Sequence, residues 1–205
     1  MIILEDAQGS DEWLQSRIGK PSASNFDKLI TATCNPSSSA ENYINRIIAE
    51  RLSNEPTEFY VNEAMTRGND LEPQARAFFE FETGIDVHQT GFILDDSKEF
   101  GCSPDGVILE KGKVVSGLEI KCPLGAAAVG NLRRNLMPKK YYQQVQGCMW
   151  ICNVETWWFM SYHPKMKAMI VEIKRDNEFI AKLEDAVNLA VDIIKLETKS
   201  PPFYY

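Results

Sequence analysis

The sequence has 205 residues, enough for one domain with a sizeable hydrophobic core. Its 44% hydrophobic and 25% charged content is that of an ordinary globular protein, and no apolar run reaches the ~18 residues that a membrane-spanning helix needs. The N-terminus lacks the basic start and long apolar stretch of a signal peptide. We therefore expect a cytoplasmic protein, with no membrane partner, whose five cysteines are reduced thiols.

The net charge of −7 argues against a nucleic-acid partner only if the charges are evenly spread, and they are not. Residues 120–154 contain no acid and five cations, namely Lys121, Arg133, Arg134, Lys139 and Lys140. Because the Debye length is roughly 8 Å at physiological salt, acids on a distant face are largely screened from a phosphate bound near these cations. On their own, the cations fit a solvated surface as well as a face that contacts the DNA backbone.

Apolar residues at helical spacing predict that most of the first 83 residues are helical. The expected helices are 10–18, 22–33, one that follows Ser38 and runs through Leu52, and 61–83. Ser38 and Glu41 have the spacing of a capping box, in which each side chain bonds the other residue's backbone N–H. We expect Gly68 and Pro73 to interrupt the last of these helices, and Gly84 to end it.

After residue 84 the pattern changes to the alternation of β-strands. The expected strands are 87–94, one that begins at Phe100, 107–109, 114–122, 154–162 and 168–174, with a four-residue hairpin loop over 110–113. Pro138 suits the first turn of a helix that ends at Cys152, and residues 125–136 form a short helix or a mobile loop. Residues 177–199 form an amphipathic helix. With no repeat and no linker, this order predicts a single α/β domain over residues 1–205.

Asp105 sits in a Ser-Pro-Asp-Gly turn and is followed fourteen residues later by Glu119-Ile120-Lys121. In a strand side chains alternate faces, so Glu119 and Lys121 share the face opposite to Ile120. Two carboxylates near one point repel each other, and Mg²⁺ or Mn²⁺ bound to their hard oxygens relieves that repulsion. The carbonyl of Ile120 can add a ligand, and Lys121 can orient or deprotonate a water. The pattern indicates a metal-dependent nuclease.

Interpretations other than a nuclease site also stay open at this point. The pattern of Asp105 followed by Glu119 and Lys121 is short, so it can occur by chance. An ordinary surface hairpin can also contain an Asp-Gly turn and a strand edge with Glu and Lys. Cys148 and Cys152 lie four residues apart on an expected helix and could bind a metal, but the chain has only two histidines and no second close cysteine pair, so we interpret them as thiols. The four tryptophans are interpreted as core residues rather than as platforms for stacked bases.

The acidic motif and its surroundings resemble lambda exonuclease and the YqaJ-like phage recombination nucleases, a branch of the PD-(D/E)XK superfamily. The similar segments are Trp13 to Phe26, which contains Arg17-Ile18-Gly19 and Ser22-Ala23-Ser24, Arg67 to Arg76, Ser103 to Gly106, Leu118 to Pro123, Tyr142 to Trp150, and Phe159 to Lys167. They span most of the chain in the family's order. The resemblance implies a restriction-endonuclease-like α/β core, with a central mixed β-sheet flanked by helices.

The resemblance also implies how the catalytic residues divide their roles. Glu72 would join Asp105 and Glu119 around two Mg²⁺ ions, directly or through water, with Mn²⁺ as an alternative ion. Lys121 would complete the catalytic centre together with Gln144, which matches the family's active-site glutamine. The neighbouring Gln143 and Gln146 are interpreted as structural or solvent-facing.

A second implied site is a pocket for a terminal 5′-phosphate. Arg17, Ser24 and Ser103 match the family positions that form it, and Gln144 can bond the same phosphate. A guanidinium forks onto phosphate oxygens while hydroxyls donate to others, so these residue types suit the role. Arg133, Arg134, Lys139 and Lys140 are placed to contact the DNA backbone.

Similar proteins digest the 5′-ended strand of linear duplex DNA to mononucleotides and leave a 3′ overhang for a single-strand annealing protein. The resemblance therefore implies a phage or prophage 5′→3′ exonuclease in the cytoplasm of a bacterial host, with a ring-shaped homotrimer as its assembly. One alternative is a structure-specific or restriction-type endonuclease of the same superfamily. The other is a non-catalytic module that binds DNA ends, although Asp105, Glu119 and Lys121 are all present.

Overall fold

The computed structural model describes residues 1–57 and 63–199, with residues 63–65 described by their backbone alone. The N-terminal part contains β1 (Ile2–Ile3), α1 (Asp11–Arg17), the 3₁₀ helix η1 (Ala23–Lys28), α2 (Ala40–Ser53) and α3 (Glu63–Thr83). Helix α1 confirms the predicted helix 10–18, and the side chain of Ser10 caps it by accepting a hydrogen bond from the backbone N–H of Trp13. Residues 61 and 62 of the predicted helix 61–83 lie outside the described residues.

Three predicted details of this region are wrong: the length of the helix over 22–33, the capping box before α2, and the interruption of α3. The helix predicted over 22–33 is only the 3₁₀ turn η1, because the carbonyls of Leu29 and Ile30 accept hydrogen bonds from Ser37 N and Gln143 Nε2 instead of continuing a helix. Helix α2 has no capping box, since its N-cap is Ser39, whose side chain makes no capping hydrogen bond, and the N–H of Ser39 donates to Ser37 Oγ instead.

Helix α3 runs without a break past Gly68 and Pro73, which the sequence analysis expected to interrupt it. Ala75 and Phe79 of α3 are fully buried against the central sheet. That tertiary packing offsets the hydrogen bond lost at the proline and the entropy cost of the glycine.

The strands form two sheets. In the first, β1, β2 (Ile93–Leu94) and β3 (Gly101–Cys102) pair antiparallel in that order. Of the strand predicted over 87–94, only β2 at its end and one bridge between His88 and Val107 are present. Instead Gly91 N donates to the carbonyl of Leu4, and a Cβ on Gly91 would lie 2.2 Å from the carbonyl oxygen of Asp6, so the N-terminal segment occupies the place of a partner strand.

The second sheet is mixed and has the order β4–β5–β6–β7, with β4 (Gly106–Glu110), β5 (Lys113–Lys121), β6 (Thr156–Ser161) and β7 (Met169–Lys174). Strands β5 and β6 are parallel, and the other pairs are antiparallel. Glu110 pairs with Lys113, so the hairpin loop has two residues rather than the predicted four. Lys111 and Gly112 at its tip both have positive φ, as a two-residue hairpin turn requires.

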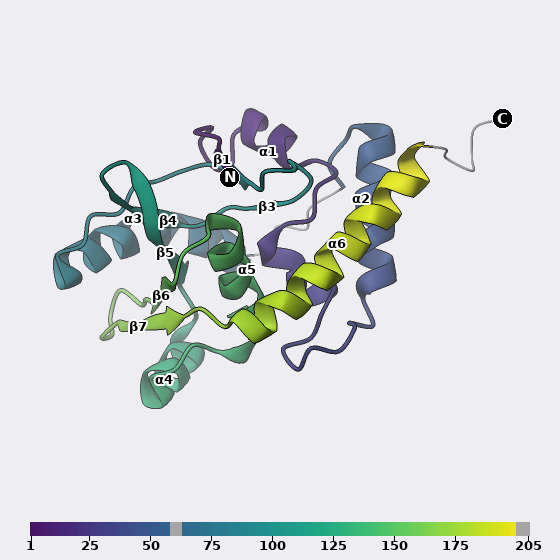
Figure 1. The fold of residues 1–205 in the computed structure, drawn as a ribbon. Coiled ribbons are helices and arrows are strands. Elements are labelled where there is room, and N and C mark those ends of the chain that lie inside the picture. Colours follow the sequence, from purple (N-terminus) through teal and green to yellow (C-terminus); the bar gives the residue numbers. More distant parts are fainter. Residues whose placement is uncertain (58–62, 200–205) are drawn as a thin grey trace.

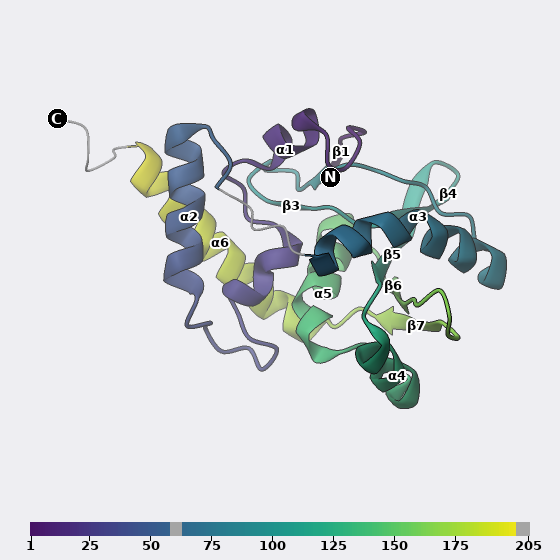
Figure 2. The ribbon, with the colours of Figure 1, turned by 180° about the vertical axis from the view of Figure 1, so that it is seen from behind.

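Helices join and cover this sheet. The connection from β5 to β6 carries α4 (Gly125–Arg134), the 3₁₀ turn η2 (Lys139–Tyr141) and α5 (Tyr142–Cys152), and α6 (Asn177–Lys199) ends the described chain. Of the short helix or mobile loop predicted over 125–136, residues 125–134 form a helix, and the helix predicted from Pro138 to Cys152 begins with a 3₁₀ turn. Figure 1 shows α6 crossing beside α2, and Figure 2 shows the same pair from behind.

The hydrophobic core has two parts, one on each face of the central sheet. On one face Trp157 and Phe159 of β6 pack with residues of α5 and α6, including Val145 and Leu183. On the other face Leu118 and Ile120 of β5 pack with residues of α3. This arrangement confirms the predicted α/β fold with a mixed central sheet flanked by helices. None of the helices in residues 1–57 and 63–199 has the length and apolar content needed to cross a membrane.

Candidate active site

Glu119 lies near the end of β5 and its side chain is fully buried. Its Oε1 atom lies 2.5 Å from Lys121 Nζ and accepts a hydrogen bond from Gln144 Nε2 at 2.7 Å. The other oxygen, Oε2, has no hydrogen-bond partner among the described residues. Burial raises the pKa of Glu119 to about 7, and the nearby charges of Asp105 and Glu72 add to the rise. A buried carboxylate oxygen without a partner is costly, so a bound cation would stabilise this arrangement.

Asp105 lies in the turn between β3 and β4 and points at β5. Its Oδ2 atom accepts a hydrogen bond from the backbone N–H of Ile120 at 2.5 Å, which places its carboxylate beside the residue between Glu119 and Lys121. A Cβ on the following Gly106 would lie 2.2 Å from Cγ1 of Val87, so only glycine lets the turn pack here. Burial raises the pKa of Asp105.

Glu72 is the third carboxylate, and it comes from α3. Its Oε1 atom accepts a hydrogen bond from Arg76 Nη2 at 2.5 Å, one helical turn along. Burial raises the pKa of Glu72 to about 7, and the carboxylate of Asp105 adds to the rise. Three carboxylates from α3, the β3–β4 turn and β5 therefore disfavour one another's ionised forms.

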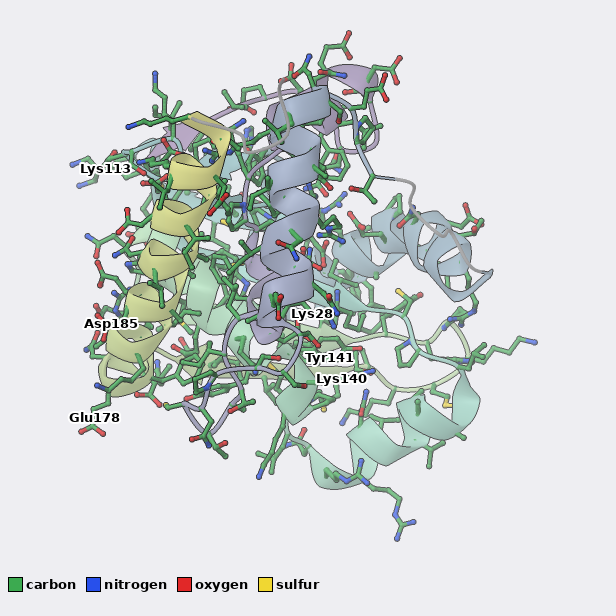
Figure 3. All side chains as sticks on the ribbon, turned by 90° about the vertical axis from the view of Figure 1, so that its right-hand side faces the viewer. Lys28, Lys113, Lys140, Tyr141, Glu178 and Asp185 are labelled. Atoms are coloured by element: carbon green, nitrogen blue, oxygen red, sulfur yellow. The ribbon has the colours of Figure 1, made fainter. Side chains whose placement is uncertain are left out.

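Lys121 is the last residue of β5. Burial lowers its pKa, but the carboxylates of Glu119 and Asp105 outweigh burial and raise the pKa above its usual range. Its Nζ atom also lies 5.3 Å from the centre of the Tyr141 ring, and Lys140 Nζ lies 4.8 Å from the same ring. Figure 3 shows Tyr141 and Lys140 side by side.

Two cavities meet at the carboxylates. One, of about 520 Å³, is lined by Glu72, Asp105, Lys121, Lys140 and Tyr141 among others. The other, of about 450 Å³, is also lined by Glu72 and Asp105, and it opens toward Trp13. Trp13, interpreted from the sequence as a core residue, is thus part of a cavity wall, whereas Trp157 is fully buried as expected.

The residues expected to bind a terminal phosphate lie on this same side of the molecule. Arg17 Nη1 and Trp13 Nε1 both donate hydrogen bonds to Ser103 Oγ, each at 3.2 Å, and the guanidinium of Arg17 lies 4.2 Å from the centre of the Trp13 ring. Ser103 is two residues before Asp105, so this cluster adjoins the carboxylates. Ser24 does not bond Arg17 or Ser103, but its exposed hydroxyl lies 3.3 Å from that of Ser22, which is bridged to β3.

The expected backbone-binding cations are not brought together. Lys140 lines the larger cavity, and Lys139 is exposed in the same 3₁₀ turn. Arg133 and Arg134 are exposed in the last turn of α4, and neither lines the two cavities at the carboxylates. Gln144 bonds Glu119 rather than the Arg17 cluster, whereas Gln143 and Gln146 bond the backbone carbonyls of Ile30 and Lys174, which confirms their structural interpretation.

The donor set of the site suits a hard divalent cation, since all three acidic residues supply oxygen. As the side chains stand, the described residues contain no group of three or more His, Cys, Asp and Glu arranged to hold an ion. Lys121 and Arg76 pair with oxygens of Glu119 and Glu72 instead. Oε2 of Glu119 has no partner among the described residues, and burial, with a smaller contribution from neighbouring carboxylates, raises the pKa values of Glu72 and Glu119. A bound cation would stabilise their ionised forms, so the residues fit a metal.

Two residues at the site received no role from the sequence. Arg76 is only 8% exposed, and besides bonding Glu72 it donates from Nε to the carbonyl oxygen of Asp105 at 3.0 Å, so it ties α3 to the β3–β4 turn. Tyr141 contacts Lys121 and packs on Phe159 with ring centres 5.4 Å apart. Arg76 follows Glu72 by one helical turn, which is a detectable signal, but nothing in the sequence pairs Tyr141 with Lys121.

Comparisons with known proteins agree with this fold. The structure is similar to an alkaline exonuclease from Laribacter hongkongensis, with a TM-score of 0.82 and 29% identity over 93% of this chain and 95% of that one. A structure of the same exonuclease in complex with dAMP gives a TM-score of 0.81, also at 29% identity over 93% of this chain and 95% of that one. A phage-related exonuclease from Haemophilus somnus shares the fold, with a TM-score of 0.69 and 16% identity over 88% of this chain and 96% of that one.

No curated protein matches the sequence. Residues 12–155 match the YqaJ-like viral recombinase domain, and this range contains Arg17, Glu72, Asp105, Glu119, Lys121 and Gln144. The match covers well over half of the chain, and the chain therefore belongs to the YqaJ-like viral recombinase family.

Proposed function

We propose that this protein is a Mg²⁺-dependent 5′→3′ exonuclease that digests one strand of linear duplex DNA from its 5′ end to mononucleotides. The observation that carries the proposal is the cluster of the buried Glu119 with the half-buried Glu72 and Asp105 beside Lys121, in a member of a recombinase family. Family membership and the similar exonucleases support a nuclease in general terms. The direction of digestion and the metal are our proposal.

Glu72, Asp105 and Glu119 would hold one or two divalent ions, with the carbonyl of Ile120 as a further oxygen ligand. A bound Mg²⁺ or Mn²⁺ would supply Lewis acidity at the scissile phosphodiester. Lys121 would place its ammonium charge next to the phosphate, where it stabilises negative charge that develops during hydrolysis. Gln144 holds one oxygen of Glu119 and so fixes the direction in which its free oxygen points.

Arg17 and Ser103 would bind the 5′-phosphate of the DNA end, with Ser24 at the rim. Their cluster lies two residues along the chain from Asp105, so a phosphate held there presents the next phosphodiester to the carboxylates. An end-binding pocket beside the cleavage site favours exonuclease over endonuclease action. The overhang left behind would be the substrate of a single-strand annealing protein in the cytoplasm of the bacterial host, and a homotrimer would surround the duplex.

The test is digestion of linear duplex DNA that is labelled separately at its 5′ and 3′ ends, with Mg²⁺ or EDTA, beside a closed circular control. We expect early, Mg²⁺-dependent release of the 5′ label as mononucleotide, with the circle intact. Cutting of the circle would show an endonuclease, and binding without cleavage would show a silent end-binding module. Either result would overturn the proposal. Sedimentation at working concentration tests the trimer, which a stable monomer would exclude.

A further inference from the structure

Helix α2 packs against the segment that follows Arg17, and the proposed function gives it no role. Tyr43 Oη accepts a hydrogen bond from the backbone N–H of Ser22 at 3.1 Å, and Glu50 Oε2 accepts one from the backbone N–H of Gly19 at 3.2 Å. These two contacts place one face of α2 against the segment that joins Arg17 to Ser24. The residue between them on that face is Arg46, three residues after Tyr43 and one helical turn before Glu50.

The guanidinium of Arg46 is held in place but poorly partnered. It lies 5.0 Å from the centre of the Tyr43 ring, and its Nε atom is 3.7 Å from Glu50 Oε1, which is beyond hydrogen-bond distance. Its Nε is buried without a hydrogen-bond partner among the described residues, while one third of the side chain stays exposed. Glu50 is meanwhile occupied by Gly19 N and by the hydroxyl of Thr57. Arg46 therefore has N–H groups to spare.

Arg17 forms no ion pair within 4 Å among the described residues. Its hydrogen bond goes to a neutral hydroxyl, that of Ser103, and its face packs on Trp13. Burial lowers the pKa of Arg17, while the nearby Tyr43 and Glu50 oppose that lowering and the charge of Arg46 adds to it, so the two guanidiniums are close enough to repel each other. Arg17, Arg46 and Glu50 together carry a net charge of one positive unit, which an anion would neutralise.

A terminal phosphate differs from an internal phosphodiester in its charge. A phosphomonoester carries about 1.5 to 2 negative charges at pH 7, whereas a diester carries one, so a single arginine leaves a terminal phosphate incompletely neutralised. We propose that Arg46 is a second phosphate-binding residue, which reaches from α2 to the 5′-phosphate held by Arg17 and makes the protein select 5′-phosphorylated ends. This inference rests on the proposed function, because it assigns a further residue to the same end-binding pocket.

The competing explanation is that Arg46 is a structural cation that pairs with Glu50 across one helical turn. The two explanations differ in what a substitution does to the ratio of affinities for phosphorylated and unphosphorylated ends. Arg46→Met suits the test because its side chain still covers the Tyr43 ring but has no donor or charge. Arg46→Lys keeps the charge and loses the planar fork.

The experiment measures binding of fluorescent duplexes that carry either a 5′-phosphate or a 5′-hydroxyl, in EDTA so that nothing is cleaved. Wild type is compared with Arg46→Met, Arg46→Lys, Arg17→Ala and, as a matched charge control, Lys113→Ala. Lys113 is exposed at the β4–β5 hairpin, and Figure 3 shows it on a different part of the surface from Lys140 and Tyr141. Thermal melting of each variant verifies that it is folded.

We expect wild type to prefer the phosphorylated end and Arg46→Met to lower that preference about tenfold, the size of one charge-assisted hydrogen bond, with Arg46→Lys in between. Lys113→Ala should leave the ratio unchanged. An unchanged ratio in Arg46→Met, with a reduced ratio in Arg17→Ala, would overturn the role of Arg46 and leave the pocket standing. An unchanged ratio in both variants would overturn the pocket of the proposed function and the role of Arg46 with it.

Discussion

Glu119→Gln should make the metal-free protein more stable at pH 8 while it removes a metal ligand. The unfolded state loses the Glu119 proton near pH 4.5, whereas burial and neighbouring carboxylates keep it on in the folded state up to about pH 7. Between these values the unfolded state binds fewer protons, so the stability that is present below pH 4.5 is lost as the pH rises through 7. At about 1.36 kcal/mol per pKa unit, the loss is about 3 kcal/mol. Glutamine carries no charge, so the Glu119→Gln variant does not lose this stability.

The assay is urea unfolding of wild type and Glu119→Gln in EDTA, at pH 5 and at pH 8. The two proteins should have similar free energies of unfolding at pH 5 and differ by about 3 kcal/mol at pH 8, with the variant more stable. The matched control is Glu172→Gln on β7, where the glutamate is more than one third exposed and pairs with Lys174. The reasoning is refuted if Glu119→Gln shows no gain between pH 5 and pH 8, or if the control gains as much.

Three further predictions follow from the same geometry. Asp105→Asn keeps an oxygen that can accept from the N–H of Ile120 but removes a charge from the metal site. DNA cleavage should therefore fall at least ~10³-fold while DNA binding in EDTA persists. Near-normal cleavage would contradict the assignment of Asp105 to the site. Mg²⁺ should raise the melting temperature more at pH 8 than at pH 5.5, because protonated carboxylates do not bind Mg²⁺. An equal rise at the two pH values would argue against Glu72 and Glu119 as ligands. Gly117→Ala should cost about 1–3 kcal/mol in urea unfolding, since the new Cβ would lie 2.2 Å from Cη2 of the buried Trp157, and wild-type stability would show that the ring can move.

Hydrophobic periodicity was enough to place most helices and the central strands. Each of these elements buries one face, so its apolar residues recur at helical spacing or alternate along the strand however the elements pack. It was not enough where a distant segment supplied the hydrogen bonds. The carbonyls of Leu29 and Ile30 accept hydrogen bonds from Ser37 N and Gln143 Nε2, so η1 ends before them. Conversely, packing of Phe79 on the sheet keeps α3 helical through Pro73, which local propensity alone would have broken.

For the candidate site, the sequence by itself determined that Glu119 and Lys121 share one side of β5, because side chains alternate along a strand and the short spacing leaves no freedom. Its resemblance to a family also predicted that Glu72 and Arg17 belong with them. Only the tertiary structure decided how α3, α5 and the β3–β4 turn approach β5. That approach leaves one oxygen of Glu119 without a partner among the described residues and joins Arg76 to Asp105, while α2 packs through Tyr43 and Glu50 against the segment that follows Arg17. Contacts between residues far apart in the chain depend on how whole elements pack, and no local pattern records that packing.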